Sequence, residues 1–590
     1  MKEIGKVINS TQGSIQIMLN SIEVFEKNKS SIRVSRYLSI EDGNSEYILA
    51  SIQNVCAVQN VNADTINYTI TCTPIGSYNE SEDGINFKQG GVNLPSPTEP
   101  VYIPESKTIN AIFSSNDNYS FKIGQLSNNS SVNFYVDGNK FFGKHIAVVG
   151  STGSGKSCAV TRLLQNIMKI KDGHNGNAES LKNAHIIIFD IHSEYNTAFK
   201  LSDKEKFNVN YLDVEKLCLP YWLMNSQELE ALFIESNELN SYNQISQFKK
   251  AVILSKEKHN PELRNINYDT PVYFDINEVY RYIRNKNNEV INKNDSLPHL
   301  PKKSDGNIIN DPDSVYLNED IVFAQASQSK DTKASGGPYN GDFERFLTRL
   351  ETKLSDKRLK FITAPRKSDG SDFKTKDFDI ILQQFLGYIN KSNVTIIDLS
   401  AIPFEVLSIV VSLLSRIIFD FAFHYSKNQH KLGMVNDIPF LLVCEEAHNY
   451  IPKSGGAEYN ASRISIERIA KEGRKYGLSL MVVSQRPSEV SETIFSQCNN
   501  FIVLKLTNVN DQNCIRKLLP DNNASLVDAL PTLSTGECLA VGDAVPLPAI
   551  VKMNMPNPSP SSSNVNVFDE WNKDWIDIVF EDVIKRWRKE

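Results

Sequence analysis

The sequence predicts an α/β protein whose core is a mainly parallel β-sheet covered by helices on both faces. From about residue 140 onward the expected strands are continuous apolar runs, and segments with helical spacing separate them. Strands buried on both faces of a parallel sheet need such runs, because neither face meets water. The runs are Ile146–Val149, Ile186–Phe189, Val394–Ile397, Phe440–Val443, Leu480–Val483 and Phe501–Leu504.

The N-terminal part of the chain has a different pattern, in which apolar and polar residues alternate. The alternation is clear in Ser14–Leu19 and Ser31–Val34, and it is typical of strands with one buried face. We therefore predict a small β-barrel over residues 1–125. A Pro- and Ser-rich stretch, Leu94–Pro100, indicates a break or an exposed loop.

The apolar runs place the core at 126–219 and 391–553, and residues 220–390 form an insertion between its halves. The insertion has helical segments such as 225–256, and its composition from about 286 to 340 is typical of a mobile loop. Residues 554–590 read as a Pro- and Ser-rich linker and a C-terminal amphipathic helix. That helix packs either on its own domain or on a neighbouring subunit. Its apolar face comprises Ile576, Phe580, Val583, Ile584 and Trp587.

Composition bounds the class of protein. A chain of 590 residues is expected to hold two to four domains. We expect no membrane span and no export segment, because no stretch has eighteen uninterrupted apolar residues. Eight scattered cysteines without a CxxC pair indicate reduced thiols and a cytoplasmic location, and argue against a zinc site. The net charge of -7 excludes a uniformly basic surface, but a ring can confine positive charge to its pore.

A complete GxxxxGK[ST] motif follows the first buried run and precedes a segment with helical spacing. Glycines let the backbone fold around a phosphate with its N–H groups pointing inward. The lysine then reaches the β- and γ-phosphates, and the last hydroxyl ligates magnesium. The motif predicts an ATP and Mg²⁺ site formed by Gly150, Ser151, Thr152, Gly153, Ser154, Gly155, Lys156 and Ser157.

Acidic and amide side chains follow two later apolar runs. Glu445 and Glu446 end the run at 440–443, and Gln485 comes directly after the run at 480–483. Carboxylates at such a strand end hold magnesium and activate water. We predict that Glu445 supports the metal, that Glu446 deprotonates the attacking water and that Gln485 senses the γ-phosphate. The alternatives are solvated acids for the pair and a helix-capping residue for Gln485.

Basic residues lie between these two strands, in the segment 463–477. An arginine there can act on a neighbouring subunit's nucleotide, where it neutralises charge on the transferring phosphoryl group. Arg474 is the first choice for this role and Arg468 is the second. The alternative is a solvated basic helix face.

Taken together, these blocks resemble the HerA family of hexameric DNA-translocating ATPases. The resemblance covers about 126–200 and 390–553, and the segment from 472 to 499 is its most specific part. The matching blocks are Leu126–Lys144 leading into His145–Ser157, then Asp190–Tyr195, Glu445–Pro452, Glu472–Gly477, Ser484–Pro487 and Ser496–Asn499.

The resemblance implies a RecA-like ATPase core in a homo-hexamer, with ATP at the subunit interfaces and duplex DNA in the central channel. It implies that Asp190, Glu194 and Lys144 face the nucleotide. It also implies a separate nuclease or sirtuin-like effector protein as partner, as in DNA end processing or antiviral (anti-phage) defence.

Three functions are consistent with the sequence. The first is a helicase-like DNA translocase that serves a partner nuclease or NAD-consuming effector. The second is an ATP-regulated ring scaffold that assembles and activates effector subunits without processive translocation. The third is a conjugation or secretion motor, which is expected to carry a membrane anchor. For DNA contacts, the candidates are Lys453, the stretch 357–360 and the pair Arg366 and Lys367, each of which is alternatively a solvated surface residue.

Overall fold

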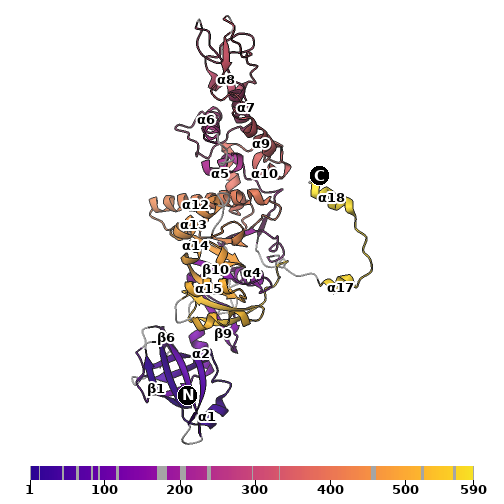
Figure 1. Cartoon of the computed structure of the whole chain (residues 1–590). Coiled ribbons are helices and arrows are strands. Elements are labelled where there is room, and N and C mark those ends of the chain that lie inside the picture. The colour runs from indigo at the N-terminus through magenta and orange to yellow at the C-terminus, as the bar shows by residue number, and fades with distance from the viewer. Residues whose placement is uncertain are drawn as a thin grey trace. The chain divides into compact units, whose positions relative to one another are not determined.

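The structure is a computed structural model that divides into two compact units (Figure 1). The first comprises residues 1–209, 421–454 and 467–562, and the second comprises 210–420, 455–466 and 563–590. The residues that the structure describes are 2–11, 13–42, 46–60, 65–81, 84–90, 93–114, 119–168, 183–199, 208–234, 241–295, 297–330, 333–453, 460–519, 524–561 and 566–588.

The first unit begins with the predicted β-barrel, drawn in indigo in Figure 1. Its strands follow the order β2-β1-β7-β3-β4-β5, and a pairing of β2 with β5 closes the barrel. Strand β6 (Gly84–Gln89) extends β5 outside this closure. The bounds are β1 Lys2–Thr11, β2 Ser14–Leu19, β3 Tyr37–Glu41, β4 Glu46–Asn60, β5 Thr65–Ser81 and β7 Pro100–Ile103.

One predicted barrel strand is wrong. The residues 31–34 form turns after helix α1 (Ile22–Asn28), where the Arg36 amide donates to the Arg33 carbonyl. Ile32 is nevertheless 3% exposed and packs into the barrel core. The apolar and polar alternation in 31–34 therefore reflects one buried side chain, Ile32, in a turn and not a strand. The stretch 94–100 is a loop that returns the chain to the barrel at β7.

The first unit also contains a sheet with the strand order β11-β16-β17-β10-β18-β19-β20-β8-β9. The strands β11 (His185–Asp190), β16 (Phe440–Cys444), β17 (Leu478–Ser484), β10 (His145–Val149) and β18 (Cys498–Leu504) are parallel. Each coincides with a predicted apolar run, and β10, β16 and β17 are buried along their whole length. Parallel strands end at the same edge, so the segments after β10, β16 and β17 meet there.

The remaining strands of this sheet were not predicted. They are β19 (Glu537–Gly542), β20 (Ala549–Met553), β8 (Ser120–Leu126) and β9 (Asn129–Asp137), and each pairs antiparallel to the next. The sheet is therefore mixed rather than mainly parallel. Helix α4 (Lys156–Met168) follows β10 and buries Val160, Leu163 and Leu164, as its spacing predicted.

The second unit is mainly helical. It contains strands β12 (Val209–Leu212) and β15 (Val394–Asp398). Strand β15 coincides with the predicted apolar run Val394–Ile397. The stretch predicted as a mobile loop instead holds short elements, namely β13 (Val290–Asn292), α8 (Pro312–Asn318) and β14 (Ala334–Gly336); its residues 296, 331 and 332 lie outside the described part. Other helices are α5 Ser226–Phe233, α6 Ser241–His259, α7 Ile276–Asn288, α9 Glu344–Ser355, α10 Lys360–Thr363 and α11 Phe378–Phe385.

A buried ion pair fixes α5 against α12 (Phe404–Lys431). The Glu228 side chain is 1% exposed, and Arg416 donates to it from Nε and from a terminal nitrogen at 2.8 Å. Ser412 adds a bond of 2.8 Å. Among the described residues, α12 is the helix long and apolar enough to cross a membrane, but 78% of its apolar window is buried inside the protein. A helix buried in a protein core can be as long and as apolar as a membrane-spanning helix, so the burial of α12 indicates a core helix.

The first part of the predicted linker after β20, residues 554–561, contacts the core of the first unit. The amide nitrogen of the Gln165 side chain donates to the Pro558 carbonyl at 2.8 Å, and Thr197 donates to the Ser559 carbonyl at 3.0 Å. The Ser561 amide donates to the Glu194 carbonyl at 2.8 Å. Residues 556–561 therefore form a strap on the core, and 562–565 lie outside the described residues.

The C-terminal segment holds helices α17 (Val567–Trp571) and α18 (Phe580–Arg588). Ile576 precedes α18, so it is not part of the predicted helical face. The described residues of this segment are all exposed, and α18 buries none of its side chains. The large exposed apolar residues include Phe568, Trp571, Trp575, Ile576, Phe580, Val583, Ile584 and Trp587.

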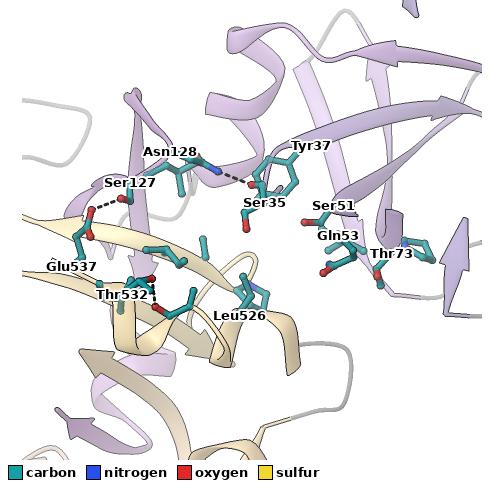
Figure 2. A pocket seen from close by; sticks show the side chains of 18 of the residues that line it. Ser35, Tyr37, Ser51, Gln53, Thr73, Ser127, Asn128, Leu526, Thr532 and Glu537 are labelled. Carbon is teal, nitrogen blue, oxygen red and sulfur yellow. Dashed lines mark hydrogen bonds between the residues drawn. The ribbon is translucent and has the colours of Figure 1, made fainter. Parts of the chain in front are cut away.

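A cavity of about 340 Å³ lies where the barrel meets the sheet of the first unit. Figure 2 shows the side chains that line it. The barrel contributes Tyr37 and Gln53, and the other side contributes Asn128 and Glu537. The Asn128 side chain donates to the Ser35 carbonyl at 2.6 Å. None of the residues 150–157 lines this cavity.

Candidate active site

The predicted phosphate-binding loop joins β10 to α4 and has the backbone that phosphate binding needs. Gly153 and Gly155 have φ values of 74° and 97°, a region that side-chain-bearing residues rarely adopt. At Gly150 an added Cβ would lie 2.6 Å from the Ser154 hydroxyl and 2.8 Å from Leu504. The glycines therefore permit both the turn and its close packing.

Neighbouring strands hold this loop in place. The Gly150 amide donates to the Ser484 carbonyl at the end of β17, at 3.3 Å. The Ser151 amide donates to the Lys505 carbonyl just after β18, at 2.8 Å. The start of the loop is therefore anchored to the strands on both sides of β10.

The side chains of the loop fit an anionic ligand and a magnesium ion. Lys156 is 7% exposed, and its ammonium group has a 3.5 Å contact with the Ser151 carbonyl. A buried cation with one long contact needs an anion nearby. Lys156 and Ser157 open the thirteen-residue helix α4, whose N-terminus also favours anions. Lys156 would therefore hold phosphate, and the Ser157 hydroxyl would hold the metal.

Glu446 lies at the end of β16 in a strained conformation. Its φ of 46° is in the left-handed region, which is rare for a residue with a long side chain. The residue is 7% exposed, and its Oε2 accepts no hydrogen bond from the described residues. The Nδ1 atom of the His448 ring lies 3.3 Å from this oxygen. A buried carboxylate oxygen without a donor suits a general base, which has to accept a proton from water.

Glu445 is oriented by a different partner. It is 2% exposed, and its Oε2 accepts a hydrogen bond of 2.8 Å from the Tyr195 hydroxyl. Burial raises the pKa of Glu445 to about 8, and the charges of Glu446 and Glu194 act in the same direction. The Tyr195 hydrogen bond and the charge of Lys156 oppose the rise. A magnesium ion beside this carboxylate would favour its charged form.

Gln485 connects the end of β17 to the phosphate-binding loop. Its side-chain oxygen accepts a short hydrogen bond from the Thr152 hydroxyl. The structure thus brings Gln485 against the loop, as a γ-phosphate sensor requires. The end of β17 lies between those of β10 and β16 in the sheet order, so this amide stands between the loop and the two glutamates.

Two predicted residues lie at the opposite edge of the sheet. Lys144 precedes β10, whereas the phosphate-binding loop follows it, and its ammonium group forms an ion pair of 2.5 Å with Asp543. The prediction that Lys144 faces the nucleotide is wrong for its own chain, because the length of β10 separates the two. Arg474 precedes β17 and donates to the Asn499 side chain at 3.1 Å. Its action on a neighbouring subunit's nucleotide stays a prediction, as does that of Arg468.

Asp190, at the end of β11, stabilises the turn that follows it. It is fully buried, and its two oxygens accept the backbone amides of Glu194 at 3.1 Å and Tyr195 at 3.0 Å. Its carboxylate thus caps the turn 190–195, and its contact with a bound nucleotide stays a prediction. That turn places Tyr195 against Glu445. Tyr195 and His448 thus contact Glu445 and Glu446, respectively. Sequence reasoning assigned neither residue a role, although both lie in the motifs that carry the family resemblance.

The arrangement can hydrolyse a nucleoside triphosphate. Lys156 and the loop amides neutralise phosphate charge, and Gln485 orients groups beside the γ-phosphate. Glu446 is the predicted acceptor of the proton from the attacking water. A bound magnesium ion supplies further positive charge on the phosphate oxygens. Fold and site together define a P-loop ATPase that uses ATP and Mg²⁺.

Comparison with known proteins identifies the family. The model of the central domain of helicase HerA matches residues 121–418, which is half of the chain. The protein belongs to this HerA family. The resemblance seen in the sequence is therefore confirmed, together with the α/β P-loop fold and the ATPase activity.

Related proteins match over most of their length. The probable helicase MJ1565 of Methanocaldococcus jannaschii is 24% identical over 97% of this chain and 88% of its own. The DNA double-strand break repair helicase HerA of Sulfolobus acidocaldarius is 26% identical over 81% of this chain and 77% of its own.

Solved structures give more distant similarities. VirB4 of Thermoanaerobacter pseudethanolicus matches with 15% identity and a TM-score of 0.42, covering 74% of this chain and 97% of that one. The plasmid coupling protein TrwB in complex with a non-hydrolysable ATP analogue matches with 13% identity and a TM-score of 0.41, covering 78% and 95%.

Proposed function

We propose that this ATPase is a DNA translocase that works as a homo-hexameric ring with duplex DNA in its central channel. The observation that carries the proposal is the complete hydrolytic site, with Lys156, Gln485 and Glu446 gathered at one sheet edge. A chain that only bound ATP would not need a carboxylate held in a strained backbone conformation at this strand end. Relatives with the same core are DNA double-strand break repair helicases.

The exposed C-terminal segment supports assembly into a ring. Its aromatic side chains are largely exposed, with Trp575 at 93% and Trp587 at 84%. Exposed apolar side chains that gather in one segment are a feature of protein interaction sites. In a closed ring, each subunit makes the same contact with the next, so one segment can be covered by the neighbouring copy at every position. We infer that this segment contacts the neighbouring subunit, and that Arg474 reaches the neighbour's nucleotide.

The further steps of the proposal concern partners and location. The ring would deliver DNA to a separate nuclease or sirtuin-like effector, in DNA end processing or anti-phage defence. The scattered, unpaired cysteines support a cytoplasmic location. Lys453, a candidate for DNA contact, forms an ion pair of 2.5 Å with Glu492. DNA phosphates would have to compete with that carboxylate.

The proposal is tested by measuring ATP hydrolysis with and without linear duplex DNA, on protein whose mass in solution has been determined. We expect a six-fold assembly and a DNA-stimulated rate. Single-molecule tracking then separates translocation from a scaffold function. Directional movement that stops in the Glu446→Gln variant supports the translocase. DNA binding without ATP-dependent movement would support the ring scaffold instead.

A further inference from the structure

A tight turn, residues 534–537, lies beside the phosphate-binding loop on the side opposite the two glutamates. The strand order places β17 and β16 on one side of β10, and β18 followed by β19 on the other side. The turn leads into β19, where Cys538 pairs with Leu504, the last residue of β18. Because β10 and β18 are parallel, the turn lies at the same edge of the sheet as the loop 150–157.

The turn contacts the phosphate-binding loop directly. The Gly536 amide donates to the Ser154 carbonyl at 3.2 Å. Gly536 has a φ of 78°, which the third position of a type II turn requires. A Cβ added to Gly155 would lie 3.6 Å from the Gly536 nitrogen and 3.8 Å from the methyl carbon of Thr535. Thr535 therefore packs over the glycine that precedes Lys156, at the start of α4.

Groups on the far side of the turn hold it in shape. The Glu537 amide donates to the Ser534 carbonyl at 3.0 Å, and the Glu537 carboxylate accepts the Ser534 amide at 2.8 Å. The same carboxylate accepts a hydrogen bond from the Ser127 hydroxyl (Figure 2). From β20, the Lys552 ammonium group donates to the Thr535 carbonyl at 2.8 Å. The position of Thr535 beside the loop is thus fixed by its own chain.

The orientation of a bound nucleotide follows from the two sides of the loop. A triphosphate whose γ-phosphate lies beside Gln485 and Glu446 has its α-phosphate toward the other side of β10. The ribose and the base extend beyond the α-phosphate, on the side where the turn lies. Thr535 and Lys552 are both exposed there. A hydroxyl and an ammonium group can donate hydrogen bonds to sugar oxygens and to ring nitrogens.

We propose that the turn 534–537 and Lys552 form the nucleoside side of the ATP site, where Thr535 and Lys552 contact the ribose and the base. Glu537 is then a positioning residue, because it holds the turn from the side away from the ligand. The phosphates and the nucleoside are thus bound by separate segments of the chain.

The test compares ADP with pyrophosphate, which has the two phosphates without the nucleoside. Both affinities are measured by calorimetry in Mg²⁺, so neither hydrolysis nor DNA is needed. For Thr535→Leu and for Lys552→Met we expect the ADP affinity to fall about tenfold, as for the loss of a hydrogen-bonded contact. The pyrophosphate affinity should stay within about twofold of wild type. Thr352→Leu, at an exposed threonine of α9, is the control and should match wild type.

Two outcomes of this comparison would overturn the proposal. Equal losses for ADP and pyrophosphate would place both side chains at the phosphates. An unchanged ADP affinity in both variants would separate them from the ligand altogether.

A second test uses the wild-type protein, so it does not depend on the folding of a variant. An azido-ATP with its reactive group on the base should attach, on irradiation, to peptides that contain residues 534–537 or Lys552. Mass spectrometry identifies these peptides, and excess ATP should suppress the labelling. Labelling confined to other peptides would overturn the proposal.

Discussion

The Nδ1 atom of His448 lies 3.3 Å from the Oε2 atom of Glu446. Burial lowers the pKa of His448, and the charge of Glu446 opposes this effect. The ring lies beside the carboxylate, and no described residue donates a hydrogen bond to the Oε2 atom. This oxygen can therefore receive a hydrogen bond from a water molecule.

The first prediction concerns Glu446 as general base. Glu446→Gln keeps the shape of the side chain but cannot accept a proton, so the chain should bind ATP and fail to hydrolyse it. We expect the single-turnover rate to fall by about 100-fold or more, while ATP affinity changes little. The control is Glu489→Gln, a half-exposed residue of the loop after β17. Wild-type turnover in Glu446→Gln would show that another group is the base.

The second prediction concerns pH and His145. This residue is 1% exposed, its Nδ1 accepts the Leu480 amide at 3.0 Å, and burial lowers its pKa to about 4. The unfolded chain binds a proton below the ordinary value of 6.5, but the folded chain does not. Stability should therefore decrease as pH falls from 6.5 to 4, by roughly 3 kcal/mol at most from this residue.

The variant His145→Asn isolates that contribution. The asparagine oxygen can replace Nδ1 as acceptor but does not titrate. Chemical unfolding of both proteins at several pH values should show a smaller loss of stability for the variant below pH 6.5. Parallel curves would mean that His145 does not contribute to the acid sensitivity.

The third prediction concerns the buried ion pair of the second unit. Arg416→Met leaves the Glu228 carboxylate buried without its cation. Breaking such a pair costs about 3–5 kcal/mol, and we expect this loss in the unfolding free energy of the second unit. The double variant Glu228→Leu with Arg416→Met removes both charges and should recover most of it. A single variant as stable as wild type would contradict the role of the pair.

The fourth prediction concerns the C-terminal segment. If α17 and α18 contact a neighbouring subunit, replacing Phe580 and Trp587 with serine should shift the assembly to smaller species in analytical ultracentrifugation. Lys585→Ser, on an exposed ion pair with Glu581, is the matched control. An unchanged mass for the double variant would place the ring contacts elsewhere.

The sequence was a good guide where burial is complete and topology is simple. Strands β10, β11, β15, β16, β17 and β18 were all predicted, because strands buried on both faces have continuous apolar runs. The ends of parallel strands share an edge, so Gln485 and Glu446 could be assigned to the nucleotide. Strands β8, β9 and β20 were missed because polar residues or a glycine interrupt their apolar residues. Strand β19 was missed although residues 538–541 form a buried apolar run.

Other predictions were wrong because they were based on composition or on family resemblance, neither of which shows the contacts of a residue. Lys144 was placed at the nucleotide by resemblance, but a residue before β10 lies at the edge away from the loop. The Pro- and Ser-rich strap was predicted as a linker because its partners, Gln165 and Thr197, lie more than 350 positions away in the sequence.

The most direct test of the account is a high-resolution structure of the protein with a non-hydrolysable ATP analogue and Mg²⁺. We expect the backbone of residues 150–157 to surround the β- and γ-phosphates, with Lys156 on the γ-phosphate. The Glu446 carboxylate should hold a water molecule in line with the terminal phosphate. A nucleotide bound away from this loop, or a Glu446 side chain turned away from the γ-phosphate, would contradict the account.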